Sequence, residues 1–211
     1  MGDGCISCHR RRGYLRCIFR IDGNAFTDRE YYLYLKNLIY RLFGRSISIQ
    51  FRKLSNSIFL AFQYNSQVNF FVNTFGFPIN KKVNLIIPQC FVKKKSFLVK
   101  VLRGIFDTDG SLYFTKNNSL LRYYPIIELS THHISLLLQL KDILSSLGFH
   151  PRISYFNDSI KLHGKKNVEK WWGEIGTSHF YKKEMYSFWK NNGYGLTWKE
   201  MFKKIYGPGG S

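Results

Sequence analysis

Two similar halves make up the sequence, and this duplication limits the possible folds more than any other feature. The stretch GDGCIS at 2–7 resembles TDGSLY at 108–113, and LKNLIYRL at 35–42 resembles LKDILSSL at 140–147. Later matches have a slightly shorter separation, as insertions and deletions in loops would cause. Because the matches keep their order along the chain, we expect two units of one fold, related by a pseudo-two-fold axis.

Hydrophobic periodicity predicts the same order of elements in each half. In the second half a helix is expected over 96–107, with Ser96 as its N-cap and Gly110 as a left-handed C-cap. The strands and helices expected after it cover 111–116, 121–130, 133–147, 151–156, 159–163 and 166–175. The sequence therefore predicts an α+β fold of two αββαββα repeats, each with a curved antiparallel sheet.

The predicted boundaries leave the first repeat incomplete. The segments are a first repeat over 1–88, a linker over 89–96, a second repeat over 97–206 and a flexible tail over 207–211. At the repeat separation, the counterpart of the helix at 96–107 would precede Met1. We therefore expect the native protein to have a further helix upstream, and the chain as given to fold poorly or to be inactive.

The charge of the chain indicates a polyanionic partner. Its 32 Lys and Arg against 13 Asp and Glu give a formal net charge of +19, far more than solubility requires. An anionic membrane surface is the weaker alternative to nucleic acid, because no apolar run approaches the roughly 20 residues of a membrane span. No signal-peptide pattern opens the chain either, so we expect a cytoplasmic protein.

The four cysteines are Cys5, Cys8, Cys17 and Cys90. Their uneven spread does not resemble the framework of a secreted disulfide scaffold, so we expect reduced thiols. A zinc site formed by the first three would lack a clear fourth ligand. The C-x-x-C-H pattern that starts at Cys5 matches a haem-attachment motif, but no export signal accompanies it. Ordinary strand and loop cysteines are the simpler interpretation.

The stretch VLRGIFDTDGS at 101–111 concentrates two carboxylates, Asp107 and Asp109, at the end of an apolar helix. The helix dipole is negative there, so a carboxylate costs roughly 0.3 to 1 kcal/mol unless a cation offsets it. A solvated Asp-Gly turn is one alternative. An EF-hand would need further oxygen ligands, and a haloacid-dehalogenase-type phosphatase would need a second acidic pair downstream. The sequence has neither feature. Because the negative end of the helix disfavours a carboxylate, we expect a positive group to bind here.

The same stretch resembles the LAGLIDADG motif of homing endonucleases and related maturases. It matches the motif at Leu102, Gly104, Asp107, Asp109 and Gly110. GDG at 2–4 then resembles the end of a truncated first copy. The motif, the duplication and the basic charge together resemble those of the two-repeat, single-chain LAGLIDADG homing endonucleases, also called DOD-type.

This resemblance implies a metal-dependent nuclease centre. The two motif helices would pack side by side at Gly104, and the last acids of the two motifs, Asp3 and Asp109, would bind Mg²⁺ or Mn²⁺. A basic residue from each half would assist: Lys82 or its neighbour Lys81, and Lys182 or its neighbour Lys183. Asp107 is assigned no direct catalytic role.

The resemblance implies that the protein is a monomer that hydrolyses double-stranded DNA at specific sites. Such cleavage would promote the mobility of an intron or intein. A maturase acting on intron RNA, or a DNA- or RNA-binding protein that does not cleave, is the alternative. In this family the sheets lie along the major groove, and strand alternation predicts which residues face the DNA. These are Arg16, Arg20, Gln50, Arg52, Arg122, Arg152 and Lys161.

Overall fold

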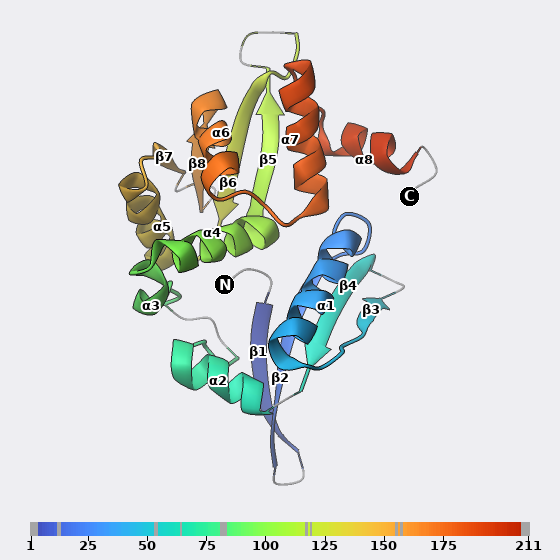
Figure 1. Cartoon of the computed structure of the whole chain (residues 1–211), viewed down its shortest axis with the longest axis vertical. Helices are drawn as coiled ribbons and strands as arrows, with labels where there is room; N and C mark the ends of the chain where they lie inside the picture. Colours follow the sequence, from blue (N-terminus) through green and yellow to red (C-terminus); the bar gives the residue numbers. More distant parts are fainter. Residues whose placement is uncertain are drawn as a thin grey trace. The chain divides into compact units, whose positions relative to one another are not determined.

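The chain divides into two compact units, which Figure 1 colours along the sequence. The computed structural model describes residues 4–11, 14–52, 55–63, 65–80, 84–116, 118, 120–154, 156 and 158–207. Unit 1 is Met1–Lys93 and unit 2 is Lys94–Ser211. The division between them lies inside the segment expected to link the two repeats.

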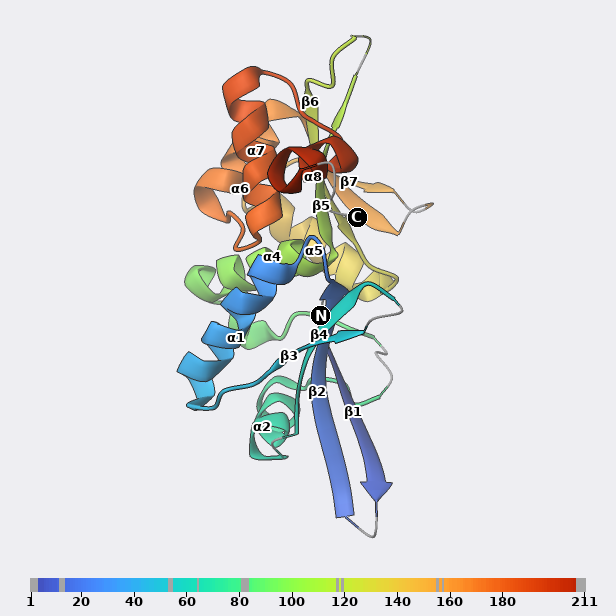
Figure 2. The same ribbon diagram turned by 90° about the vertical axis from the view of Figure 1, so that its right-hand side faces the viewer.

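Unit 1 is a four-stranded antiparallel sheet with helices on one side (Figure 2). Its strands are β1 (Gly4–Arg11), β2 (Tyr14–Asn24), β3 (Ile49–Arg52) and β4 (Ser57–Phe62). They pair in the order β1-β2-β4-β3. Its helices are α1 (Arg29–Phe43), α2 (Asn65–Phe75) and the single turn α3 (Gln89–Val92).

Unit 2 repeats this plan and adds helices. Its strands are β5 (Gly110–Thr115), β6 (Tyr124–Ser130), β7 (Pro151–Ser154) and β8 (Ser159–His163), in the matching order β5-β6-β8-β7. Its helices are α4 (Lys95–Asp109), α5 (Ile134–Ser146), α6 (Gly164–Glu174), α7 (Phe180–Asn192) and α8 (Trp198–Tyr206). The predicted α+β class and its duplicated strand order are confirmed. In the described part of the chain, no helix is both long and apolar enough to cross a membrane.

Each sheet has one buried face, as strand alternation requires. In β4, Ile58, Leu60 and Phe62 are buried in a core that includes residues of α1. In β8, Ile160 and Leu162 are fully buried. The residues between them point to the other side of the sheet, which we call the outward face. The outward faces therefore carry the side chains that are available to a partner.

The corner between α4 and β5 differs from the prediction. Helix α4 begins at Lys95, and its N-cap Lys94 makes no side-chain capping bond, so Ser96 is not the cap. Gly110 has φ −90° and ψ 156°, an extended conformation, so the predicted left-handed cap is wrong. A Cβ on Gly110 would lie 2.4 Å from the Phe106 ring and 2.6 Å from the Phe106 carbonyl oxygen. Glycine is thus needed here for space, because the strand starts without a loop.

The expectation of reduced thiols is also wrong for two cysteines. Cys8 and Cys17 are direct cross-strand partners in β1 and β2, with Cα atoms 4.1 Å apart, and they form a disulfide. Cys5 and Cys90 are free. Among the residues that the structure describes, no group of three or more His, Cys, Asp or Glu could hold a metal ion, so the zinc alternative is not supported. Strand register, which spacing alone does not reveal, decides the pairing.

A close contact between Gly195 and Phe114 joins the turn after α7 to strand β5. The Gly195 amide donates to the Arg122 carbonyl oxygen at 2.7 Å. A Cβ on Gly195 would lie 2.0 Å from atoms of the Phe114 ring. The ring also stacks against Trp189 of α7, with centroids 6.1 Å apart. The Phe114 ring therefore lies between the turn at Gly195 and helix α7. Only glycine at position 195 leaves room for the ring.

We predict that Gly195→Ala lowers the free energy of unfolding of unit 2 by about 1 to 3 kcal/mol, because Phe114 and Trp189 must move. Gly173→Ala is the matched control: Gly173 lies in α6, and a Cβ there would meet nothing within 4 Å. Urea unfolding followed by tryptophan fluorescence measures both, since all four tryptophans lie in unit 2. Equal midpoints for Gly195→Ala and wild type would contradict the close contact.

Candidate nucleic-acid interface

The two carboxylates at the end of α4 have different surroundings. Asp107 is only 4% exposed, whereas Asp109, the last residue of the helix, is partly exposed. Strand β5 follows directly, so Asp109 is fixed at a corner between a helix and a sheet. Asp3, predicted as the matching acid of the first repeat, lies outside the described residues.

Asp107 anchors the start of α7. Its carboxylate accepts hydrogen bonds from the Thr177 hydroxyl and from the Ser178 amide, the latter at 3.1 and 3.0 Å to the two oxygens. Thr177 and Ser178 lie just before α7, whose positive N-terminal end favours a nearby carboxylate. The contact is structural, and the absence of a direct catalytic role for Asp107 stays a prediction.

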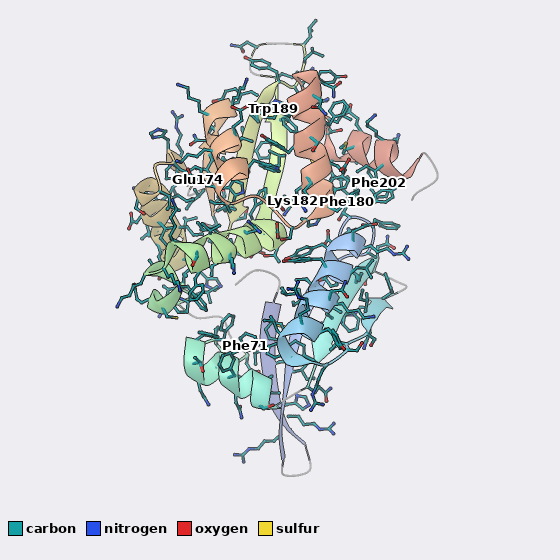
Figure 3. The ribbon with its side chains drawn as sticks, in the orientation of Figure 1. Phe71, Glu174, Phe180, Lys182, Trp189 and Phe202 are labelled. Atoms are coloured by element: carbon teal, nitrogen blue, oxygen red, sulfur yellow. A yellow bond between two sulfur atoms is a disulfide. The ribbon has the colours of Figure 1, made fainter. Side chains whose placement is uncertain are left out.

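Lys182 binds the other side of the same corner. Its amine donates to the carbonyl oxygens of Phe106 and Asp107, the second at 2.9 Å, and lies 4.8 Å from the centre of the Phe106 ring. Figure 3 shows Lys182 at the start of α7. These carbonyls are among the last of α4, where a cation offsets the negative end of the helix dipole. Lys182 thus places a positive charge at the C-terminal end of α4, the helix that ends at Asp109.

The structure distinguishes the members of one predicted lysine pair. Lys182 is partly buried against α4, whereas Lys183 is exposed. The other pair, Lys81 and Lys82, lies outside the described residues. A Cβ on Gly104 would meet no atom within 4 Å, and its role in helix packing stays a prediction.

The outward face of unit 1 is a basic, hollowed surface. Arg20 of β2 and Gln50 of β3 line a hollow of about 570 Å³ together with Phe59 of β4. Arg52 is exposed at the end of β3, and Arg16 is exposed on β2 beyond its pairing with β4. The structure thus places all four residues predicted for this half on accessible positions of the same sheet.

Two contacts hold Arg20 in place on this face. It forms an ion pair with Asp22, two residues along the strand. Its guanidinium also lies 4.4 Å from the centre of the Phe59 ring, and Arg52 lies 5.3 Å from the same centre. A cation above an aromatic face is stabilised by the ring quadrupole. Sequence reasoning missed Phe59, although alternation in β4 separates it from the buried Ile58 and Leu60.

On the outward face of unit 2, the cations lie around a carboxylate. Arg152 of β7 pairs in register with Lys161 of β8, and Lys161 pairs with Glu128 of β6. The Lys161 amine is 3.4 Å from the Glu128 carboxylate. Burial, followed by the charges of Arg152 and Lys161, lowers the pKa of His163. The imidazole is therefore neutral over more of the physiological pH range and can accept as well as donate hydrogen bonds.

The predicted position of Arg122 in a strand is wrong. Strand β6 begins at Tyr124, so Arg122 lies in the connection before it. Its guanidinium is 3.3 Å from the carboxylate of Glu200 in α8, and its carbonyl accepts from Gly195. The backbone at Arg122 thus bonds to the turn after α7 instead of to β5. The structure gives Arg122 a role in joining α8 to this connection.

Comparison with known proteins gives three findings. Residues 96–172 match the family model of the LAGLIDADG-like domain. No curated protein matches the sequence. Many solved structures do match.

A structure of mesophilic variants of the homing endonuclease I-DmoI matches with a TM-score of 0.56 at 12% identity, covering 82% of this chain and 83% of that chain. I-DmoI in complex with DNA and Mn gives 0.54 at 13% identity, over 85% and 92% of the two chains. The meganuclease I-SmaMI bound to uncleaveable DNA gives 0.51 at 12% identity, over 97% and 86%. At these identities the likeness is one of fold. Residues 96–172 thus form a LAGLIDADG-like domain, and the chain has the two-repeat fold of the LAGLIDADG homing endonucleases.

Proposed function

We propose that the protein is a site-specific endonuclease that hydrolyses phosphodiester bonds of double-stranded DNA with a divalent cation, Mg²⁺ or Mn²⁺. The main support is the end of α4 within the LAGLIDADG-like domain. Asp109 is the last residue of this helix, and the Lys182 amine binds carbonyl oxygens of its last turn. The solved complexes of I-DmoI with DNA and Mn, and with DNA and Ca, support it.

The residues at this corner suit a hard cation. A carboxylate such as Asp109 is a preferred ligand of Mg²⁺ and Mn²⁺. Among the described residues, no group of three or more Asp, Glu, His and Cys could hold a metal ion by itself. We propose that phosphate oxygens and water would complete the coordination. We propose Asp3 as the second protein carboxylate. When bound, the cation would supply an activated water and neutralise charge on the leaving oxygen.

Lys182 is suited to stabilise negative charge near the reacting phosphate. Two carbonyl oxygens and the face of Phe106 fix its position, so the amine would need little reorganisation as charge develops in the transition state. We propose Lys82 for the corresponding role in the first repeat.

Duplex DNA would bind along the two outward faces. Arg20, Arg52 and Gln50 can donate to base edges in the major groove, since arginine suits guanine and glutamine suits adenine. Arg16 and Arg152, which are exposed, would also contact the DNA. We propose that one chain supplies both halves of the recognition surface, so that it acts as a monomer on an asymmetric site.

Replacement of Asp109 by Asn should abolish metal-dependent cutting, with a loss on the order of 100-fold or more, because the variant lacks the charge that holds the cation. Duplex binding should remain. The test exposes a random duplex library to the full gene product at low salt with Mg²⁺ and sequences the cut ends. Duplex binding by the wild type with no metal-dependent cutting would instead favour a maturase or a binding protein.

Replacement of Asp107 by Asn should act on stability. The Ser178 amide and the Thr177 hydroxyl would lose a charged acceptor, and unfolding should become easier by about 1 to 3 kcal/mol. Asp142→Asn, at an exposed position of α5, should change stability by less than about 0.5 kcal/mol. Urea unfolding of both variants measures this. A fully stable Asp107→Asn variant would show that the anchor on α7 is dispensable.

The two lysines of the predicted pair should differ when each is replaced by Met. Lys182→Met should lower the single-turnover cutting rate on the order of 100-fold, since a fixed cation beside the phosphate is lost. Lys183→Met should cut at the wild-type rate, because this side chain is exposed. Single-turnover kinetics at saturating enzyme separate rate from affinity. The reverse order of effects would assign the catalytic amine to Lys183.

A further inference from the structure

The outward face of unit 2 holds a carboxylate among its cations. The Glu128 side chain is 16% exposed and accepts a hydrogen bond from the Ser159 hydroxyl at 2.5 Å. The Lys161 amine lies 3.4 Å away on the next strand. Arg152 continues the same row of the sheet on β7. A surface that only attracted phosphates would gain from an uninterrupted row of cations, so the position of Glu128 needs another explanation.

The neighbours of Glu128 donate hydrogen bonds to its carboxylate and so fix its position. Burial, followed by the hydrogen bond to Glu128, raises the pKa of the Tyr113 hydroxyl well above its usual range, so Tyr113 stays protonated and donates to the carboxylate. An ionised carboxylate has about four lone-pair sites, and Ser159, Lys161 and Tyr113 supply three donors. Capacity for one more donor remains.

The chemistry of this pair matches a C·G base pair. In the major groove, cytosine presents its N4 amino group as a donor, and guanine presents O6 and N7 as acceptors. A glutamate accepts from cytosine N4, and a lysine donates to guanine O6 and N7. Phosphates, which are acceptors only and negatively charged, would be repelled by the same carboxylate. Glu128 and Lys161 on adjacent strands therefore offer both halves of one base-pair contact.

We propose that Glu128 and Lys161 together read one C·G base pair in the major groove, with Glu128 accepting from the cytosine amino group and Lys161 donating to guanine. The assignment rests on the proposed function, since it requires that the outward face meets duplex DNA. Tyr113 and Ser159 are positioning residues that hold the carboxylate and do not themselves touch the base.

Unit 1 contains a related pair at the equivalent place. Asp22 of β2 and Glu128 of β6 occupy the second strand of their sheets, at the separation that relates GDG at 2–4 to the motif end at 108–110. Asp22 forms an ion pair with Arg20, which lies over Phe59. Each sheet thus combines one carboxylate with one fixed cation on its outward face, although the cation comes from a different position in the two units.

A binding selection tests the assignment. The full gene product, without divalent cation so that no DNA is cut, selects from a random duplex library, and the bound sequences give a base preference at each position. Glu128→Gln keeps the size of the side chain and replaces the acceptor charge by an amide. Its preference for C·G should fall on the order of tenfold at one base pair, with the other positions unchanged.

Two further variants complete the design. Lys161→Met should lose preference at the same base pair, and it also serves if Glu128→Gln fails to fold. Glu169→Gln is the matched control, because Glu169 lies in α6 and pairs with Lys190, away from the outward face. Its profile should equal that of the wild type.

An unchanged profile for Glu128→Gln and Lys161→Met, or a uniform loss of affinity over all sequences, would overturn the base-reading role and leave a structural ion pair. A wild-type protein that selects no sequence at all would instead overturn the proposed function. Thermal unfolding of each variant separates these outcomes from a loss of fold.

Discussion

The reciprocal connection between α4 and α7 holds the candidate catalytic corner in place. Asp107 binds the amide and hydroxyl that precede α7, and Lys182 of α7 binds the last carbonyls of α4. Each charge meets the helix end whose dipole has the opposite sign, so both contacts are favourable. Strand β5 starts directly after Asp109. The contacts between α4 and α7 therefore also orient the start of this strand.

The outward faces show how a basic surface can carry sequence information. Charge alone gives affinity for any duplex, because phosphates are the same in every sequence. Discrimination needs fixed donors and acceptors. Each unit pairs a carboxylate with a cation, along one strand in unit 1 and across two strands in unit 2. Burial of part of each pair in the sheet surface limits its freedom, which would lower the entropy cost of the proposed base contact.

Much of the fold could be predicted from the sequence, because strand and helix periodicity are local and the duplication shows each pattern twice. The ββαββα order that both units share, and the buried faces of their strands, were predictable in this way. Arg122 was misplaced because its carbonyl bonds to Gly195, far along the chain. The Cys8–Cys17 bond was missed because it depends on the register of two strands. Gly110 was assigned a left-handed conformation on residue type, whereas the crowding by Phe106 explains the glycine.

The sequence by itself determined the duplicated α+β architecture, the basic outward strands and the acidic helix end, since each is a property of residue type and spacing along the chain. The tertiary structure gives neighbouring residues different surroundings: Asp107 is buried as an anchor beside the partly exposed Asp109, and Lys182 contacts α4 whereas Lys183 is exposed. It also brought Glu128 to Lys161. The physical reason is that burial and strand register depend on segments distant in sequence, which local patterns do not record.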